Sequence, residues 1–193
     1  MVEVFHEPAR ARPKKRAGVI AAAGAALALA GGAYLLIGGD EGGPEGVERI
    51  EGLQTVDVSG AGDHTTETVE YRLRPPAGGP HHPVWQNCGF YSEPIKDEHA
   101  VHAMEHGTVW IAYAPELDAD SVERIGVAVR DHMYVLASPY PGVEGTVMSA
   151  WGYRLELDGV DDPRFADFIG LFAGSRHVPE AGGPCHGGTG TPE

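Results

Sequence analysis

Residues 97–113 read DEHAVHAMEHGTVWIAY, and this stretch contains the pattern that decides the fold. Residues 97–106 are typical of a short helix, which Gly107 ends. The residues from 108 to 113 are mostly β-branched or aromatic, which is typical of a strand. Helix and strand therefore follow one another directly, and both kinds of element are expected in one folded unit.

Further strands are predicted on both sides of this stretch. They are expected at residues 54–58, 67–73, 133–137, 146–151 and 153–157. With helices between and after them, these strands predict an α+β domain with an antiparallel or mixed sheet covered on one face.

Two more helices are predicted after residue 113, which makes about three in all. The first is expected to begin at Asp120, because Asp120 and Glu123 resemble a capping box before apolar residues at helical spacing. The second is expected to have Asp162 as its N-cap, Pro163 in its first turn and Gly174 as its stop.

The N-terminal part contains an uncharged run, residues 17–37, which is long enough to span a bilayer as a helix. Five Lys and Arg residues precede the run, and Asp40 and Glu41 follow it. The positive-inside rule then places the basic tail, residues 1–16, in the cytoplasm and the C-terminal part outside. This predicts a single-pass protein of the plasma membrane. A cleaved signal peptide ending at Ala30 is the alternative, and it also exports the domain.

The chain as a whole is acidic in spite of its basic N-terminal tail. The 28 Asp and Glu residues exceed the 14 Lys and Arg residues and give a net charge of −14. A surface of this sign repels phosphate backbones, so no nucleic-acid partner is expected. Residues 38–48 are rich in Gly and are expected to form a flexible linker. The domain is expected at residues 49–185, with a flexible tail at 186–193.

The two cysteines, Cys88 and Cys185, are expected to form a disulfide if the domain is exported. A bridge over 97 residues would join the C-terminal segment to the domain. The alternative is a thiolate metal site that uses Cys185 and the neighbouring His186.

Five histidines between residues 81 and 106 provide the strongest chemical signal. His102 and His106 are four residues apart on the predicted helix and therefore share a face. His81, in a Gly- and Pro-rich loop, is the first candidate for a third ligand, and His64 is the second. Neutral imidazoles suit zinc or copper, so we expect one such ion at His81, His102 and His106.

A structural role for these histidines remains open. They can donate hydrogen bonds to Glu98, Glu105 and backbone carbonyl groups instead of binding an ion. The order His-x-x-Glu-His differs from the zinc-protease pattern, so Glu105 is placed on a different part of the helix and is expected only to support the site. His82, His99 and His186 are expected to be solvated.

The chain resembles a bacterial family, domain of unknown function 3105, over about residues 48–185. The resemblance rests on the order and spacing of short strings that include GGPH at 78–81, WQNCG at 85–89, VHAMEHG at 101–107, SPYP at 138–141 and SAWG at 149–152. The NCG string is similar to the actinobacterial branch. The resemblance implies a membrane-anchored extracytoplasmic domain without an established activity, and its motif histidines correspond to His64, His81, His102 and His106.

Three functions follow from these observations. The first is an exported metal-binding domain for copper or zinc. The second is a non-catalytic module that contacts an envelope protein and has structural histidines. The third is a metal-assisted hydrolase, which is the weakest because no nucleophile or general base is identifiable beyond Glu98 and Glu105. The sequence therefore favours a function without catalysis.

Overall fold

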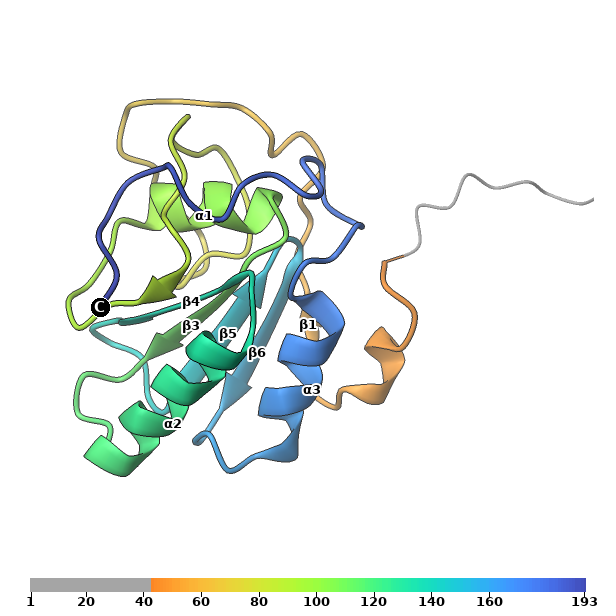
Figure 1. Cartoon of the computed structure of the whole chain (residues 1–193). Coiled ribbons are helices and arrows are strands. Elements are labelled where there is room, and N and C mark those ends of the chain that lie inside the picture. The colour runs from red at the N-terminus through yellow and green to blue at the C-terminus, as the bar shows by residue number, and fades with distance from the viewer. Residues whose placement is uncertain (1–42) are drawn as a thin grey trace, which may run out of the picture. The chain divides into compact units, whose positions relative to one another are not determined.

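The computed structural model describes residues 43–193 (Figure 1). The expected cytoplasmic tail, the expected membrane span at 17–37 and residues 38–42 of the expected linker lie outside the described residues. Within residues 43–193, no helix is long and apolar enough to cross a membrane.

The described residues contain three α-helices, one short 3-10 helix and six strands. In chain order these are η1 (Val47–Arg49), β1 (Gln54–Thr55), β2 (Gly89–Phe90), α1 (Asp97–Glu105), β3 (Val109–Tyr113), α2 (Ala119–Asp131), β4 (Val135–Pro139), β5 (Thr146–Ala150), β6 (Tyr153–Leu157) and α3 (Pro163–Phe172).

The strands form one mixed sheet in the order β1-β6-β5-β3-β4-β2. Strands β3 and β4 are parallel, because α2 carries the chain back across the sheet between them. Strand β5 is antiparallel to both β3 and β6, and β2 adds a short parallel edge to β4. The predicted α+β class and mixed sheet are therefore confirmed.

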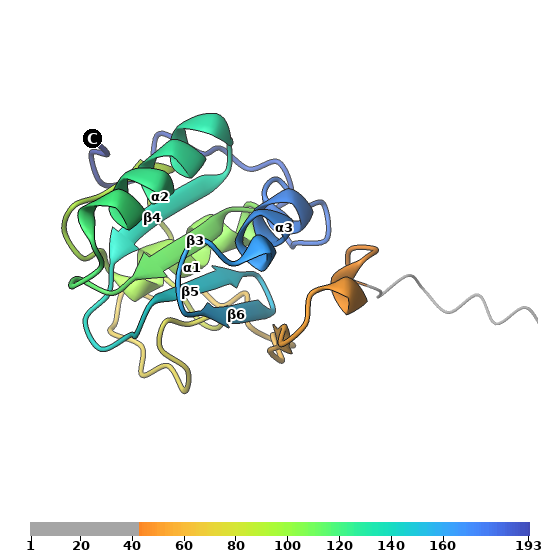
Figure 2. The same ribbon diagram turned by 90° about the horizontal axis from the view of Figure 1, so that it is seen from below.

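Both faces of the sheet are covered, so the expectation of one covered face is wrong. Helices α2 and α3 lie on one face, and α1 lies with long loops on the other (Figures 1 and 2). Alternate side chains of β3 point to opposite faces of the sheet. Val109 and Ile111 pack in the core under α2 and α3. Trp110 and Ala112 pack in the core beneath α1.

The segment at residues 67–73 is not a strand, so the prediction of a strand there is wrong. It belongs to the loops on the α1 face, and its backbone bonds to side chains rather than to a neighbouring strand. The Val69 N–H, for example, donates to the Glu98 carboxylate at 2.9 Å. The first strand is also shorter than expected, since only Gln54 and Thr55 pair with β6. The edge strand β2 had no pattern long enough to predict it.

The helix starts agree with the sequence at α3 and differ at α2. Asp162 caps α3 by accepting from the Arg164 N–H at 2.9 Å, and Pro163 is the first helical residue, as predicted. In α2 the N-cap is Asp118 rather than Asp120. Its carboxylate accepts from the Ser121 N–H at 2.9 Å, which satisfies a donor in the first turn.

The last residues of the chain lie against the α1 face, although residues 186–193 were expected to form a flexible tail. The Thr189 N–H donates to the Trp85 carbonyl at 2.9 Å, and the Asn87 N–H donates back to the Thr189 carbonyl at 2.9 Å. Further along, the Glu193 N–H donates to the Phe90 carbonyl at 2.9 Å. These backbone bonds attach the C-terminal segment to the loop before β2 and to β2 itself.

Candidate metal centre

Helix α1 supplies three side chains to the site from one of its faces. His102, Glu105 and His106 are spaced i, i+3 and i+4 and are each about 3 % exposed. The opposite face of the helix, with Val101 and Met104, packs on the sheet. The polar face of α1 is therefore buried against loops, where its groups need partners.

The loop at residues 63–81 places two more histidines over this face. The Thr65 N–H donates to the His81 carbonyl at 2.7 Å, and the His81 N–H donates to the Asp63 carbonyl at 3.0 Å. This backbone pairing holds His64 and His81 side by side, with their ring centroids 4.8 Å apart.

These residues form what we call the inner group, which consists of His64, His81, His102 and Glu105. Each offers one nitrogen or oxygen, and the four atoms lie within 4.8 Å of one another, so the group could hold a metal ion. The Glu105 Oε2 atom lies 3.0 Å from His81 Nε2 and 4.0 Å from His64 Nε2. Donors around a tetrahedral zinc ion lie about 3.4 Å apart, so small side-chain rotations would bring the four atoms to an ion.

Backbone carbonyl groups orient three of the imidazoles. The Nδ1 atom of His81 is 2.9 Å from the Gly79 oxygen, that of His102 is 2.7 Å from the His82 oxygen, and that of His106 is 2.9 Å from the Pro184 oxygen. A carbonyl oxygen only accepts, so Nδ1 carries the hydrogen and Nε2 keeps a lone pair in the neutral ring. Metal-binding histidines in proteins show this same arrangement. The Nε2 atom of His106 is also within hydrogen-bond distance of the Glu180 carboxylate, at 3.1 Å.

The Nε2 atom of His81 is an orphaned buried acceptor. The His81 side chain is 0 % exposed, and this atom has no hydrogen-bond partner. It faces the Glu105 carboxylate, which also only accepts when ionised. Two acceptors at 3.0 Å repel unless a proton or a cation lies between them.

A second set of ligands, the outer group, consists of His102, His106 and Glu180. The Glu180 Oε2 atom lies 3.1 Å from His106 Nε2 and 3.7 Å from His102 Nε2. Glu180 belongs to residues 180–185, which we call the strap. The Glu180 N–H donates to the Glu105 carbonyl at 3.1 Å, and the Tyr134 hydroxyl donates to the Gly183 carbonyl at 3.0 Å.

The two cysteines hold the far end of the strap. Cys88 and Cys185 are paired, with Cα atoms 5.3 Å apart, inside the range for disulfides. The Cys88 N–H also donates to the Cys185 carbonyl at 2.8 Å. Cys185 therefore joins the strap to the domain and is not a metal ligand beside His186.

The structure divides the three histidines that we expected to bind one ion. His81 and His106 fall into different groups, and His102 belongs to both. The physical reason is that His106 follows His102 by four residues, about 6 Å along the helix axis, so the loop that carries His81 reaches only His102, whereas Glu180 reaches both rings. His64, the second candidate for the third ligand, is in the inner group with His81.

The acidic residues also differ from expectation. Glu105 lies within the inner group, because i and i+3 side chains share a helix face. Glu98 is in neither group and instead binds the loop through Val69. Glu180 was not predicted, since nothing near it in the sequence marks a ligand and only the folded strap brings it to His106.

His82 and His99, expected to be solvated, form a pair of their own outside both groups, with ring centroids 4.3 Å apart.

The electrostatic environment favours the neutral form of the His102 ring, which is shared by the two groups. Burial lowers the pKa of His102, and the nearby rings of His106, His81 and His64 lower it further. The hydrogen bond to the His82 carbonyl acts in the opposite direction. A lowered pKa keeps the ring neutral to lower pH, which is the state that binds a metal ion.

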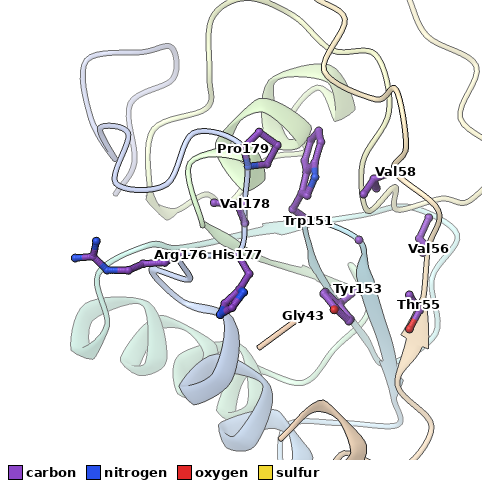
Figure 3. Close-up of a pocket in the computed structure, with 11 residues that line it drawn as sticks. Gly43, Thr55, Val56, Val58, Trp151, Tyr153, Arg176, His177, Val178 and Pro179 are labelled. Carbon is purple, nitrogen blue, oxygen red and sulfur yellow. The ribbon is translucent and has the colours of Figure 1, made fainter. Parts of the chain in front are cut away.

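Two tryptophans enclose the row of imidazoles. Trp85 lies 4.9 Å from His106 and Trp151 lies 5.8 Å from His81, measured between ring centroids. Trp151 also lines a cavity of about 490 Å³, where it stands between Val58 and the segment at Val178 and Pro179 (Figure 3). Trp151 therefore separates this cavity from the inner group.

The fold and the site together define a mixed α+β domain whose buried His and Glu groups could hold a metal ion. The chain belongs to the family described as protein of unknown function DUF3105, which matches residues 64–187. The matched segment begins at His64 and includes both groups, the strap and the two cysteines. Searches of curated proteins and of solved structures gave no match.

Proposed function

We propose that this domain binds a divalent transition-metal ion, zinc or copper, at the inner group. The observation that carries the proposal is the orientation of the imidazoles. His81 and His102 each use Nδ1 on a backbone carbonyl, which leaves Nε2 free beside Glu105. The buried Nε2 atom of His81 has no hydrogen-bond partner, and a cation would satisfy it together with the carboxylate.

The donor set supports an ion of borderline softness. Three imidazoles and one carboxylate suit Zn²⁺ and Cu²⁺, whereas Cu⁺ prefers sulfur ligands. Met104, the sulfur residue next to Glu105 in the sequence, is 0 % exposed and packs in the core beneath α1. It therefore supplies no thioether to the inner group.

The competing function is a domain whose histidines are purely structural. In that case a proton would lie between His81 and Glu105, and the pair would be a buried ion pair at 3.0 Å. Such a pair stabilises the fold without any metal. The free Nε2 atom of His102 would then have no role.

Zinc retention separates these two functions. The full-length chain, equilibrated with zinc and freed of excess metal by gel filtration, is expected to retain at least one equivalent. A His82→Ala/His99→Ala double variant is the control, because it removes two half-buried imidazoles that lie near the site but outside both groups, and it keeps the His82 carbonyl that binds His102. Retention below a tenth of an equivalent would favour the structural function.

We further propose that the domain lies on the outer side of a plasma membrane, attached by residues 17–37. The support is the charge asymmetry around this apolar run. A reporter enzyme that requires export is expected to be active when it is fused after Glu193. Activity of only a cytoplasmic reporter at the same position would contradict this topology.

A further inference from the structure

We propose that the outer group binds a second divalent ion, beside the first and more weakly. The inference rests on the proposed function of the inner group and extends it to a site that takes two ions in sequence. The outer group has its own carboxylate, Glu180, and its own imidazole, His106, so it does not depend on Glu105 or His81.

The strap prepares His106 as a ligand. The Pro184 carbonyl accepts from His106 Nδ1 at 2.9 Å, which directs Nε2 toward Glu180 at 3.1 Å. The backbone of Gly183 lies against the face of the His106 ring, where a Cβ atom would come within 2.6 Å of the ring carbons. Trp85 packs on the same ring. Only glycine at position 183 allows this close approach, and the ring has little freedom to turn away.

His102 explains why the two ions bind in sequence. Its Nδ1 atom is committed to the His82 carbonyl, so the side chain has one free nitrogen, Nε2, for both groups. The first ion uses it to complete four donors in the inner group. When a second ion enters, His102 binds only one of the two ions, and the other ion has one donor fewer. Repulsion between two cations a few ångströms apart also weakens the second step.

Each group has one ligand that solvent reaches: the His64 side chain of the inner group is 42 % exposed and the Glu180 side chain of the outer group is 48 % exposed, whereas those of His81, His102 and Glu105 are 4 % exposed or less. Solvent access therefore does not set the order of binding. The larger number of donors in the inner group sets it, and the outer group is the second binding position at higher metal concentration.

The disulfide connects the second position to the redox state of the protein. Cys185 directly follows Pro184, and its bond to Cys88 fixes the end of the strap. A dithiol reductant would open this bond, with two electrons converting the disulfide to two thiols while the reductant becomes a disulfide. The strap would then be held by hydrogen bonds alone, and Glu180 and the Pro184 carbonyl would hold His106 less firmly.

Calorimetric titration of the full-length chain with zinc chloride tests this proposal. The wild type is expected to show two steps and to bind two equivalents in total. Glu180→Gln is expected to keep the first step and lose the second, while Glu105→Gln weakens the first. Glu144→Gln, at an exposed loop position, is the control for loss of one negative charge and should leave both steps unchanged.

The role of the disulfide is tested by the same titration on a variant that lacks both cysteines. A Cys88→Ser/Cys185→Ser variant is expected to keep the first step and to bind the second ion about ten- to hundredfold more weakly, the usual effect of losing support behind a ligand. A single step in the wild type, or two unchanged steps in Glu180→Gln, would overturn the second site. Absence of any step in the wild type would instead overturn the proposed function of the inner group.

Discussion

Replacing His102 by alanine is expected to lower the affinity for zinc by more than a hundredfold and to remove both binding steps. His102 is the one imidazole present in both groups of the described residues, so its loss affects each ion. Loss of an indirect contact behind a metal ligand already costs about ten- to hundredfold in affinity, and loss of a ligand costs more. Competition with a chelator of known affinity measures the change.

His99→Ala is the matched control for this substitution. His99 lies on the same helix, three residues earlier, and belongs to neither metal group. The zinc affinity of the His99→Ala variant should equal that of the wild type. Thermal unfolding of both variants without metal shows whether α1 remains folded. An unchanged affinity in folded His102→Ala would mean that the row of histidines is structural.

Removing the disulfide is expected to produce the largest loss of stability. In the chain-entropy model, a bridge that closes a loop of 97 residues stabilises the folded state by about 4–5 kcal/mol. The Cys88→Ser/Cys185→Ser variant should show this decrease in the free energy of unfolding, measured by urea denaturation without metal. The reduced wild type should unfold at the same urea concentration as the variant.

A loss below about 1 kcal/mol would contradict this expectation. It would show that the hydrogen bonds between the C-terminal segment and residues 85–90 are sufficient to hold the chain end. The strap would then not depend on the disulfide, and the redox connection to the outer group would fail with it.

The main elements of the fold could be predicted because their signals are local. The β-branched and aromatic residues from Val109 to Tyr113 identified β3, and the Asp162–Pro163 pair identified the start of α3. The edge strand β2 has two residues, which is too short for a periodic pattern, and β1 forms over only two of the five residues predicted at 54–58. Residues 67–73 have strand-like alternation, but the fold uses their backbone in a loop bound to Glu98.

Only the part of the site that follows from helical spacing and from loop composition could be predicted from the sequence. The i, i+4 pair of His102 and His106 was evident, and the glycine-rich loop indicated His81. The sequence does not show on which side of α1 each loop passes, so it could not separate the inner group from the outer one. Glu180 is contributed by a long-range backbone contact, the bond from its N–H to the Glu105 carbonyl, and no local pattern encodes it.

The most direct test of the central claim is X-ray absorption at the zinc edge on the full-length chain loaded with one equivalent of zinc. The donor set of the inner group predicts a first shell of nitrogen and oxygen at about 2.0–2.1 Å, with the outer scattering of imidazole rings and no sulfur. A sulfur shell at about 2.3 Å, or a spectrum of hydrated zinc without imidazole scattering, would contradict it.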